Sequence, residues 1–269
     1  MNRIERRFRE LAAKREPAFI PYITAGDPTL ARTAELVLHL EGAGADIIEL
    51  GVPFSDPVAD GVVNQEAAQR ALKHGVSLHA IVALVKRLRT QTQIPIVLFT
   101  YYNPVLAYGI DAFANHAANA GVDGVLCVDL PPEEAAGYKR LLDGKDIATI
   151  FLIAPTSTPE RIELIAKRST GFVYYVSRTG VTGERASVEA SVKGMVAEIK
   201  RHTAIPVAVG FGISTPAQAA EVASYADGVI VGSAIVRMIG QLGDTPEMPG
   251  KVGAFVKSLV DAAKRPTGK

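Results

Sequence analysis

The chain of 269 residues contains no tryptophan and a single cysteine, Cys127. One cysteine excludes an internal disulfide and any metal site built from several cysteines. No apolar run approaches the ~20 residues that a membrane-spanning helix needs. The first residues mix charges of both signs and are not followed by the apolar segment of a signal peptide. We therefore expect a cytoplasmic protein that does not enter the membrane.

An excess of charge of one sign is also lacking. Lysine and arginine total 29 and aspartate and glutamate total 28, so the formal net charge is +1. This balance provides no general electrostatic attraction for nucleic acid or for an anionic membrane. Hydrophobic residues make up 48% of the chain and charged residues 21%. That usage is ordinary for a globular protein and excludes disorder, collagen and coiled coil as the main organisation.

Short β-branched runs alternate with longer stretches of helical composition along the chain. Strands that alternate with helices pair in parallel through right-handed crossovers. Eight such units in about 250 residues is the count of an α/β fold of the (β/α)8 (TIM) barrel type. A doubly wound open sheet is the structural alternative, because one sequence does not show the order of its strands. The predicted strands are residues 19–24, 46–51, 94–100, 124–128, 147–153, 172–177, 205–210 and 228–232.

We predict one barrel domain over residues 1–269, preceded by an extra amphipathic helix over residues 2–14. The chemistry of such a barrel lies at the C-terminal ends of its strands. One strand, residues 46–51, contains a carboxylate, Glu49. Side chains alternate along a strand, so Glu49 points away from the face that carries Ile48 and Leu50. The surrounding helices are expected to cover that apolar face, and Glu49 then points into the barrel.

A carboxyl group buried in the barrel would have a raised pKa, because burial disfavours its charged form. A raised pKa suits a general acid or base that works near neutrality. The alternative is a structural glutamate paired with an inward arginine or lysine. None of the predicted strands contains either residue, so we favour the catalytic interpretation of Glu49.

The segment after this strand is long and contains two prolines, Pro53 and Pro57, and two acids, Asp56 and Asp60. Long ordered loops in compact domains are often functional, and prolines reduce the entropy lost when such a loop is ordered. Either acid could instead cap a helix or face solvent.

Glycine gathers at three late strand ends, in the segments 180–183, 210–212 and 232–233. Ser233 opens a short predicted helix directly after the eighth strand. Helix N-termini bind anions, and barrels often hold phosphate in the loops after strands seven and eight. We therefore predict a phosphate site, although glycine can also simply end a strand. The segment is not a dinucleotide fingerprint, because Thr215 occupies the position of its third glycine.

Histidine and lysine are missing from the strands. The five histidines fall in predicted helices or at their ends, away from the catalytic end of the barrel. We therefore predict no metal site and no Schiff-base lysine in the barrel interior. The residues alone indicate a phosphate-binding barrel that uses carboxylates for its chemistry.

Residues 48–61, read as IELGVPFSDPVADG, resemble the signature of the tryptophan synthase α subunit family. Further motifs of that family match in order at residues 19–28, 177–183, 210–214 and 232–236. The resemblance covers nearly the whole chain. It implies a (β/α)8 barrel that cleaves indole-3-glycerol phosphate to indole and glyceraldehyde 3-phosphate and has no cofactor of its own. It also implies that indole passes to a partner β subunit, which contains pyridoxal phosphate, in an αββα heterotetramer.

The resemblance also implies residue roles. Glu49 would protonate C3 of the indole ring and take the proton of the glycerol hydroxyl, Asp60 would stabilise positive charge at the indole nitrogen, and Tyr174 would help to place Glu49. Position 22 is Tyr where Phe is familiar, and position 99 is Phe where Leu is familiar. The implied substrate contacts are Tyr22, Phe99, Ile153, Thr182, Gly183, Phe211, Gly212, Gly232 and Ser233. The implied partner contacts are Pro53, Asp56, Pro57, Asn103, Pro104, Pro131 and Pro132.

Two other functions remain open at this level. The chain could be a non-catalytic subunit that regulates or scaffolds such a complex, but it retains both Glu49 and Asp60. It could also be another phosphate-binding barrel enzyme, such as a sugar-phosphate isomerase. In that case the segment between residues 51 and 61 has no explanation.

Overall fold

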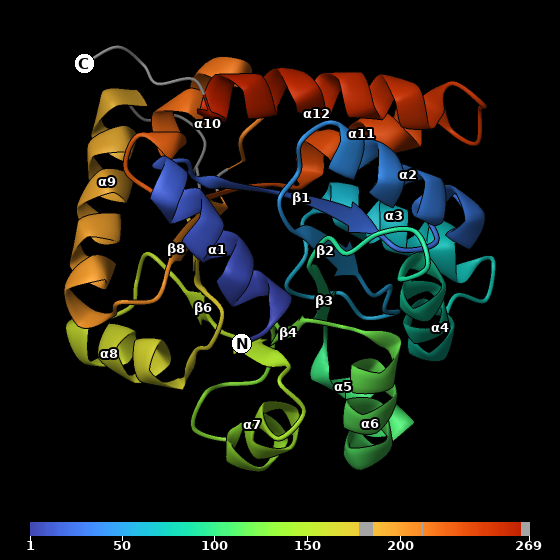
Figure 1. Ribbon diagram of the computed structural model, residues 1–269, viewed down its shortest axis with the longest axis horizontal. Helices are drawn as coiled ribbons and strands as arrows, with labels where there is room; N and C mark the ends of the chain where they lie inside the picture. The colour runs from blue at the N-terminus through green and yellow to red at the C-terminus, as the bar shows by residue number, and fades with distance from the viewer. Residues whose placement is uncertain (178–184, 211, 265–269) are drawn as a thin grey trace.

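The computed structural model describes residues 1–177, 185–210 and 212–264. In this part of the chain, parallel strands form a barrel surrounded by helices (Figure 1). The strands are β1 (Ala18–Thr24), β2 (Ile48–Gly51), β3 (Ile96–Thr100), β4 (Gly124–Cys127), β5 (Ala148–Ile150), β6 (Leu152–Ile153), β7 (Val173–Val176), β8 (Val207–Gly210) and β9 (Gly228–Val231).

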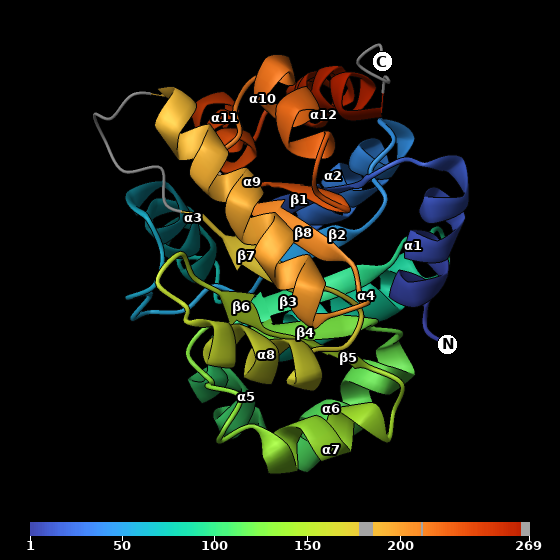
Figure 2. The same cartoon turned by 90° about the vertical axis from the view of Figure 1, so that its left-hand side faces the viewer.

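The helices cover the outside of the barrel, except for α1 (Figure 2). They are α1 (Arg3–Lys14), α2 (Leu30–Gly42), α3 (Val62–Leu72), α4 (Leu78–Leu88), α5 (Tyr102–Tyr108), α6 (Ile110–Ala120), α7 (Ala136–Asp143), α8 (Pro159–Arg168), α9 (Arg185–His202), α10 (Pro216–Ala223), α11 (Ser233–Leu242) and α12 (Met248–Lys264). Among the residues described, no helix is both long and apolar enough to cross a membrane.

The order of the strands confirms the predicted barrel and removes the open-sheet alternative. The sheet runs β5-β4-β3-β2-β1-β9-β8-β7-β6. Its two end strands, β5 and β6, follow each other in the chain on either side of Phe151, so they close the sheet on itself. The single strand predicted over residues 147–153 is thus interrupted at Phe151. The predicted amphipathic first helix and the short helix after the last strand are present as α1 and α11.

Two helices, α3 and α5, were not expected from the sequence, because neither has a clear start signal. Helix α3 begins with the β-branched Val62 and Val63 and has no side-chain cap at Gly61. Helix α5 contains Pro104 and also begins without a side-chain cap. Helix α5 has weak intrinsic propensity and depends on packing, whereas Ala67, Ala68 and Ala71 favour α3 once it has begun.

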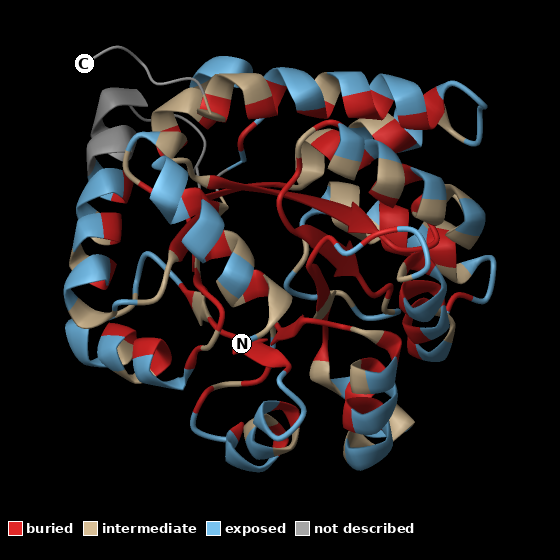
Figure 3. Ribbon diagram, in the orientation of Figure 1, coloured by how far each residue is buried: buried red, intermediate tan, exposed pale blue. Residues whose placement is uncertain are grey.

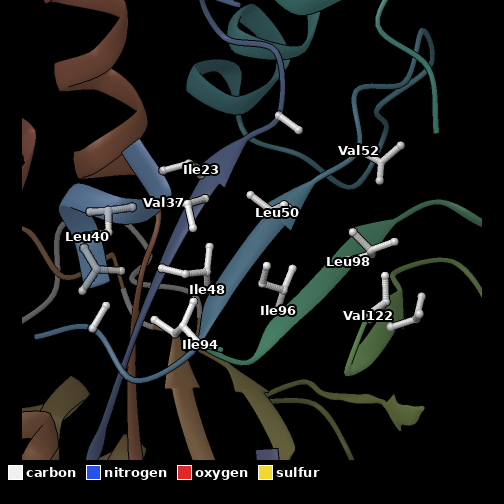
Figure 4. Packing of buried hydrophobic residues seen from close by; sticks show 14 of the residues in the cluster. Ile23, Val37, Leu40, Ile48, Leu50, Val52, Ile94, Ile96, Leu98 and Val122 are labelled. Atoms are coloured by element: carbon white, nitrogen blue, oxygen red, sulfur yellow. The ribbon is translucent and has the colours of Figure 1, made fainter. Parts of the chain in front are cut away.

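The strands separate two hydrophobic cores, and Figure 3 shows that nearly all strand residues are buried. The outer core lies between strands and helices. It includes Ile48 and Leu50 of β2, which pack beside Ile96 and Leu98 of β3 (Figure 4). The inner core fills the barrel and includes Ile47. This alternation places Glu49, between Ile48 and Leu50, on the inner side as predicted.

Helix α1 closes the end of the barrel at which the strands begin. Its apolar residues Ile4, Phe8 and Leu11 belong to the inner core. Arg7 Nη2 contacts Oδ1 of the fully buried Asp46 at 2.6 Å. Because α1 fills this end of the barrel, a ligand that enters the barrel does so at the C-terminal ends of the strands.

Candidate active site

A cavity of about 410 Å³ lies at the C-terminal ends of the strands, within the usual size range of ligand pockets. Strands β1, β3, β7, β8 and β9 contribute to it, together with the first residues of α3 and α11. The residues that line it are Tyr22, Gly61, Val62, Val63, Asn64, Phe99, Tyr174, Val176, Ser177, Gly210, Gly212, Ile230, Gly232 and Ser233. The cavity therefore brings together residues from both halves of the barrel.

Glu49 is completely buried beside this cavity. Neither oxygen of its carboxyl group has a hydrogen-bond partner among the described residues. Burial raises the pKa of Glu49 to about 8, because water no longer stabilises the charged form. Its register partner on β1 is Tyr22; burial first, and the charge of Glu49 in addition, raises the pKa of Tyr22 and of Tyr174. The group is therefore protonated near neutral pH and lies within electrostatic reach of two residues of the cavity wall.

Asp60 is half-buried and is held by hydrogen bonds. The Tyr101 hydroxyl donates to Asp60 Oδ2 at 2.9 Å and accepts from the Ala59 amide at 2.9 Å. Burial raises the pKa of Asp60, while hydrogen bonds with the side chains of Tyr101 and Asn64 oppose that rise. Asp60 also raises the pKa of Tyr22. The two carboxyl groups named from the sequence therefore act on the same tyrosine of the cavity.

Sequence reasoning did not identify Tyr101 or Asn64. The available signal for Tyr101 is its position: it follows Thr100, the last residue of β3, at the catalytic end of the barrel. Nothing in the sequence shows that its hydroxyl reaches Asp60, 41 positions earlier in the chain.

We expect Tyr101→Phe to raise the pKa of Asp60, because a hydrogen bond to the ionised carboxylate is lost. Hydrogen bonds to charged groups contribute about 1.5–3 kcal/mol, so we expect kcat/KM to fall by roughly tenfold or more. The acidic limb of the pH profile of kcat/KM should move to higher pH. Tyr102→Phe is the matched control, because the ring of Tyr102 packs on Tyr138. An unchanged acidic limb in Tyr101→Phe would contradict this role.

The apolar wall of the cavity contains Tyr22 and Phe99, whose rings meet edge to face with centroids 5.3 Å apart. Two glycines make room for the tyrosines. A Cβ atom on Gly51 would overlap the Tyr22 ring, and one on Gly210 would lie 2.6 Å from the Tyr174 hydroxyl oxygen. From the sequence we expect Gly210 to belong to a phosphate-binding turn. In the structure, the side chain closest to it is that of Tyr174. The wall can accommodate a flat aromatic group.

Three other residues that line the cavity offer an anion-binding arrangement. Gly212, with a positive φ of 52°, lines the same cavity as Gly232 and Ser233. Helix α11 has Gly232 as its N-cap and begins at Ser233. The amide groups and the dipole at a helix N-terminus favour a phosphate group. The structure thus brings together the three described residues that were expected to bind phosphate.

Ile153 does not reach the cavity. It is fully buried in the outer core, whereas its neighbour Leu152 packs against the inner core. Side chains alternate along the strand, and Ala148 and Ile150 already face inward. The inward position after them is therefore 152, so Leu152 and not Ile153 faces the barrel interior. The other expected contacts Thr182, Gly183 and Phe211 lie outside the described residues.

The residues expected to meet a partner differ in exposure. Asp56 and Asn103 are exposed, and Pro57, Pro104 and Pro131 are partly exposed. Pro53 and Pro132 are buried and can only shape the loops that contain them. Two large apolar side chains on the same segments face solvent, Val58 with 88% and Leu106 with 50% exposed.

Potential metal ligands are scattered over the residues that the structure describes. In those ranges, no three or more histidine, cysteine, aspartate or glutamate side chains are grouped as metal ligands. Cys127 is buried, and burial raises the pKa of its thiol to about 12, which suits a structural role.

The comparisons with known proteins agree with this geometry. The model of the family "Tryptophan synthase alpha chain" matches residues 8–264. The tryptophan synthase alpha chain of Geobacter sulfurreducens is 53% identical over 97% of this chain and 99% of its own length. That of Geotalea daltonii is 51% identical over 96% of this chain and 98% of its own length. The crystal structure of tryptophan synthase subunit alpha from Legionella pneumophila superposes with a TM-score of 0.90, at 39% identity over 98% of each chain. Sequence and fold thus match over nearly the full length, and the chain belongs to the tryptophan synthase alpha chain family.

Proposed function

We propose that Glu49 and Asp60 are the acid–base pair with which this chain cleaves indole-3-glycerol phosphate. As a member of its family the chain is the lyase subunit, which forms indole and glyceraldehyde 3-phosphate. The observation that supports the assignment most strongly is the Glu49 carboxyl group. It is buried, has no hydrogen-bond partner among the described residues, and has a pKa of about 8. A carboxyl group that is protonated at neutral pH can act as a general acid.

The two carboxyl groups have different roles in the reaction. Protonated Glu49 donates its proton to C3 of the indole ring, and the ring becomes an iminium ion with positive charge at its nitrogen. Ionised Asp60 stabilises that charge. Glu49, now a carboxylate, takes the proton from the hydroxyl on the carbon attached to C3. The bond between that carbon and C3 breaks, its electron pair neutralises the iminium ion, and the hydroxyl carbon becomes the aldehyde of glyceraldehyde 3-phosphate.

This route requires no lysine or metal, because the protonated indole itself accepts the electron pair. Tyr22 and Phe99 supply the apolar wall for the indole ring. Gly212, Gly232 and Ser233 supply the phosphate site at the start of α11. Thr182, Gly183 and Phe211 are further substrate contacts in this proposal.

Family membership implies a β-subunit partner for this chain. We assign to that partner the pyridoxal phosphate, the onward reaction of indole, and the other half of an αββα assembly in the cytoplasm. The surface offered to it includes Asp56, Asn103 and Pro104. The exposed Val58 and Leu106 supply apolar area on the same segments.

The test is indole release by the purified chain, with and without added β subunit. Indole is fluorescent, and the chain itself contains no tryptophan, so its fluorescence is recorded against little background. We expect release by the chain alone and a faster rate with the β subunit. A chain that stimulated the serine chemistry of the β subunit but released no indole would be a scaffold, and the lyase assignment would be wrong.

A further inference from the structure

Arg70, near the C-terminal end of α3, links three elements of the active site on their outer side. Its guanidinium makes a two-point contact with Asp27: Nε lies 2.8 Å from Oδ1 and Nη2 lies 2.8 Å from Oδ2. Asp27 follows β1, and only 2% of its side chain is exposed. The same guanidinium lies against α11, since a Cβ atom on Gly240 would be 2.8 Å from Nη2.

Each of the three elements contributes to the cavity. Strand β1 carries Tyr22, which lines the cavity. Helix α3 begins two residues after Asp60 and carries Asn64, whose side chain opposes the rise in the pKa of Asp60. Helix α11 begins at Ser233 of the proposed phosphate site. Helices α3 and α11 also pack directly against each other.

From this arrangement we infer that Arg70 is a positioning residue that sets the Asp60 segment and the phosphate-binding helix relative to each other. The inference rests on the proposed function for its kinetic part. A guanidinium is planar and rigid and binds a carboxylate through two parallel hydrogen bonds. It therefore fixes direction as well as distance between α3 and the segment after β1. An ammonium group on a flexible stem keeps the charge but not this geometry.

Gly240 provides a way to separate positioning from stability. It lies inside α11, where alanine favours the helix more than glycine does. The added Cβ atom would displace the guanidinium of Arg70, because the closest atoms to it are Nη2, Cζ and Nη1. Gly240→Ala should therefore disturb the contact between Arg70 and α11 without lowering the stability of the chain.

The experiment compares Arg70→Lys, Gly240→Ala and wild type in the full chain. The probe for the phosphate site is glycerol 3-phosphate, whose Kd is measured by calorimetry. Turnover of indole-3-glycerol phosphate gives kcat and KM, and thermal unfolding gives Tm. We expect Arg70→Lys to raise the Kd and the KM at least fivefold and to lower kcat at least threefold. We expect Gly240→Ala to raise both constants at least threefold with an unchanged or higher Tm.

Arg89→Lys is the matched control. Arg89 Nη2 forms a comparable ion pair with the buried Asp123 at 2.7 Å, at the opposite end of the barrel. This control should lower Tm and leave Kd, KM and kcat within twofold of wild type. The inference is overturned if Arg70→Lys and Gly240→Ala both stay within twofold of wild type, or if Arg89→Lys weakens phosphate binding equally. Because the Kd does not depend on turnover, a chain without lyase activity would contradict the proposed function, while the Kd comparison would still decide the role of Arg70.

Discussion

Glu49→Gln should lower the rate of indole release by about 10²–10⁴-fold, the usual contribution of a general acid–base group. Glutamine has nearly the same size and shape as glutamic acid, so it fits the same buried position. It cannot donate a proton to the indole ring or take one from the glycerol hydroxyl. The measurement is kcat for indole-3-glycerol phosphate, with circular dichroism to confirm the fold.

Glu66→Gln is the matched control for this prediction. Glu66 lies on the exposed side of α3, close in sequence to Asp60 but outside the cavity lining. The same chemical change at this position should leave kcat within twofold of wild type. Full activity of Glu49→Gln, in a chain that is folded, would show that another group performs the proton transfers.

The same substitution should make the chain more stable at alkaline pH. The pKa of Glu49 is about 8 in the folded chain, against an ordinary value of 4.5 for a glutamate in water. Between these two values the unfolded chain releases a proton that the folded chain keeps. The free energy of unfolding therefore falls as pH rises through this range. The full effect is on the order of 5 kcal/mol, at about 1.4 kcal/mol for each pH unit.

Glutamine does not titrate, so Glu49→Gln should lack this loss. We expect urea unfolding to give similar free energies for the two chains near pH 4 and a clearly more stable variant near pH 8.5. The difference between the two chains, followed from pH 4 to pH 9, is the quantity that tests the pKa. Parallel curves over this range would mean that Glu49 titrates normally or has a partner when folded.

If Glu49→Gln is more stable than wild type but inactive, burial of the Glu49 carboxyl group explains both effects. A buried carboxyl group without a partner disfavours the folded state once it ionises. Its raised pKa is also the property that allows it to donate a proton at neutral pH. Loss of stability and gain of catalytic function would therefore have the same origin, as is common at active sites.

The sequence by itself was enough for the alternation of strands and helices and for the inward direction of Glu49, whereas the order of the strands in a closed barrel came from the structure. Alternation of Ile48 and Leu50 with Glu49 depends only on strand geometry, which is local. The positions of Gly232 and Ser233 after the last strand follow from the rule that parallel strands end on one face. Such features depend only on residues that are adjacent in the chain and on the class of fold. Both can be inferred from the order of the residues.

Other features were decided only by the tertiary structure. The hydrogen bond from Tyr101 to Asp60 and the contact of Arg70 with Asp27 join residues 41 and 43 positions apart. That Leu152 rather than Ile153 faces the barrel interior depends on the register of one short strand, where a shift of one residue reverses the face. Local patterns determine which face a side chain takes, but only the packed barrel determines which distant side chain it meets.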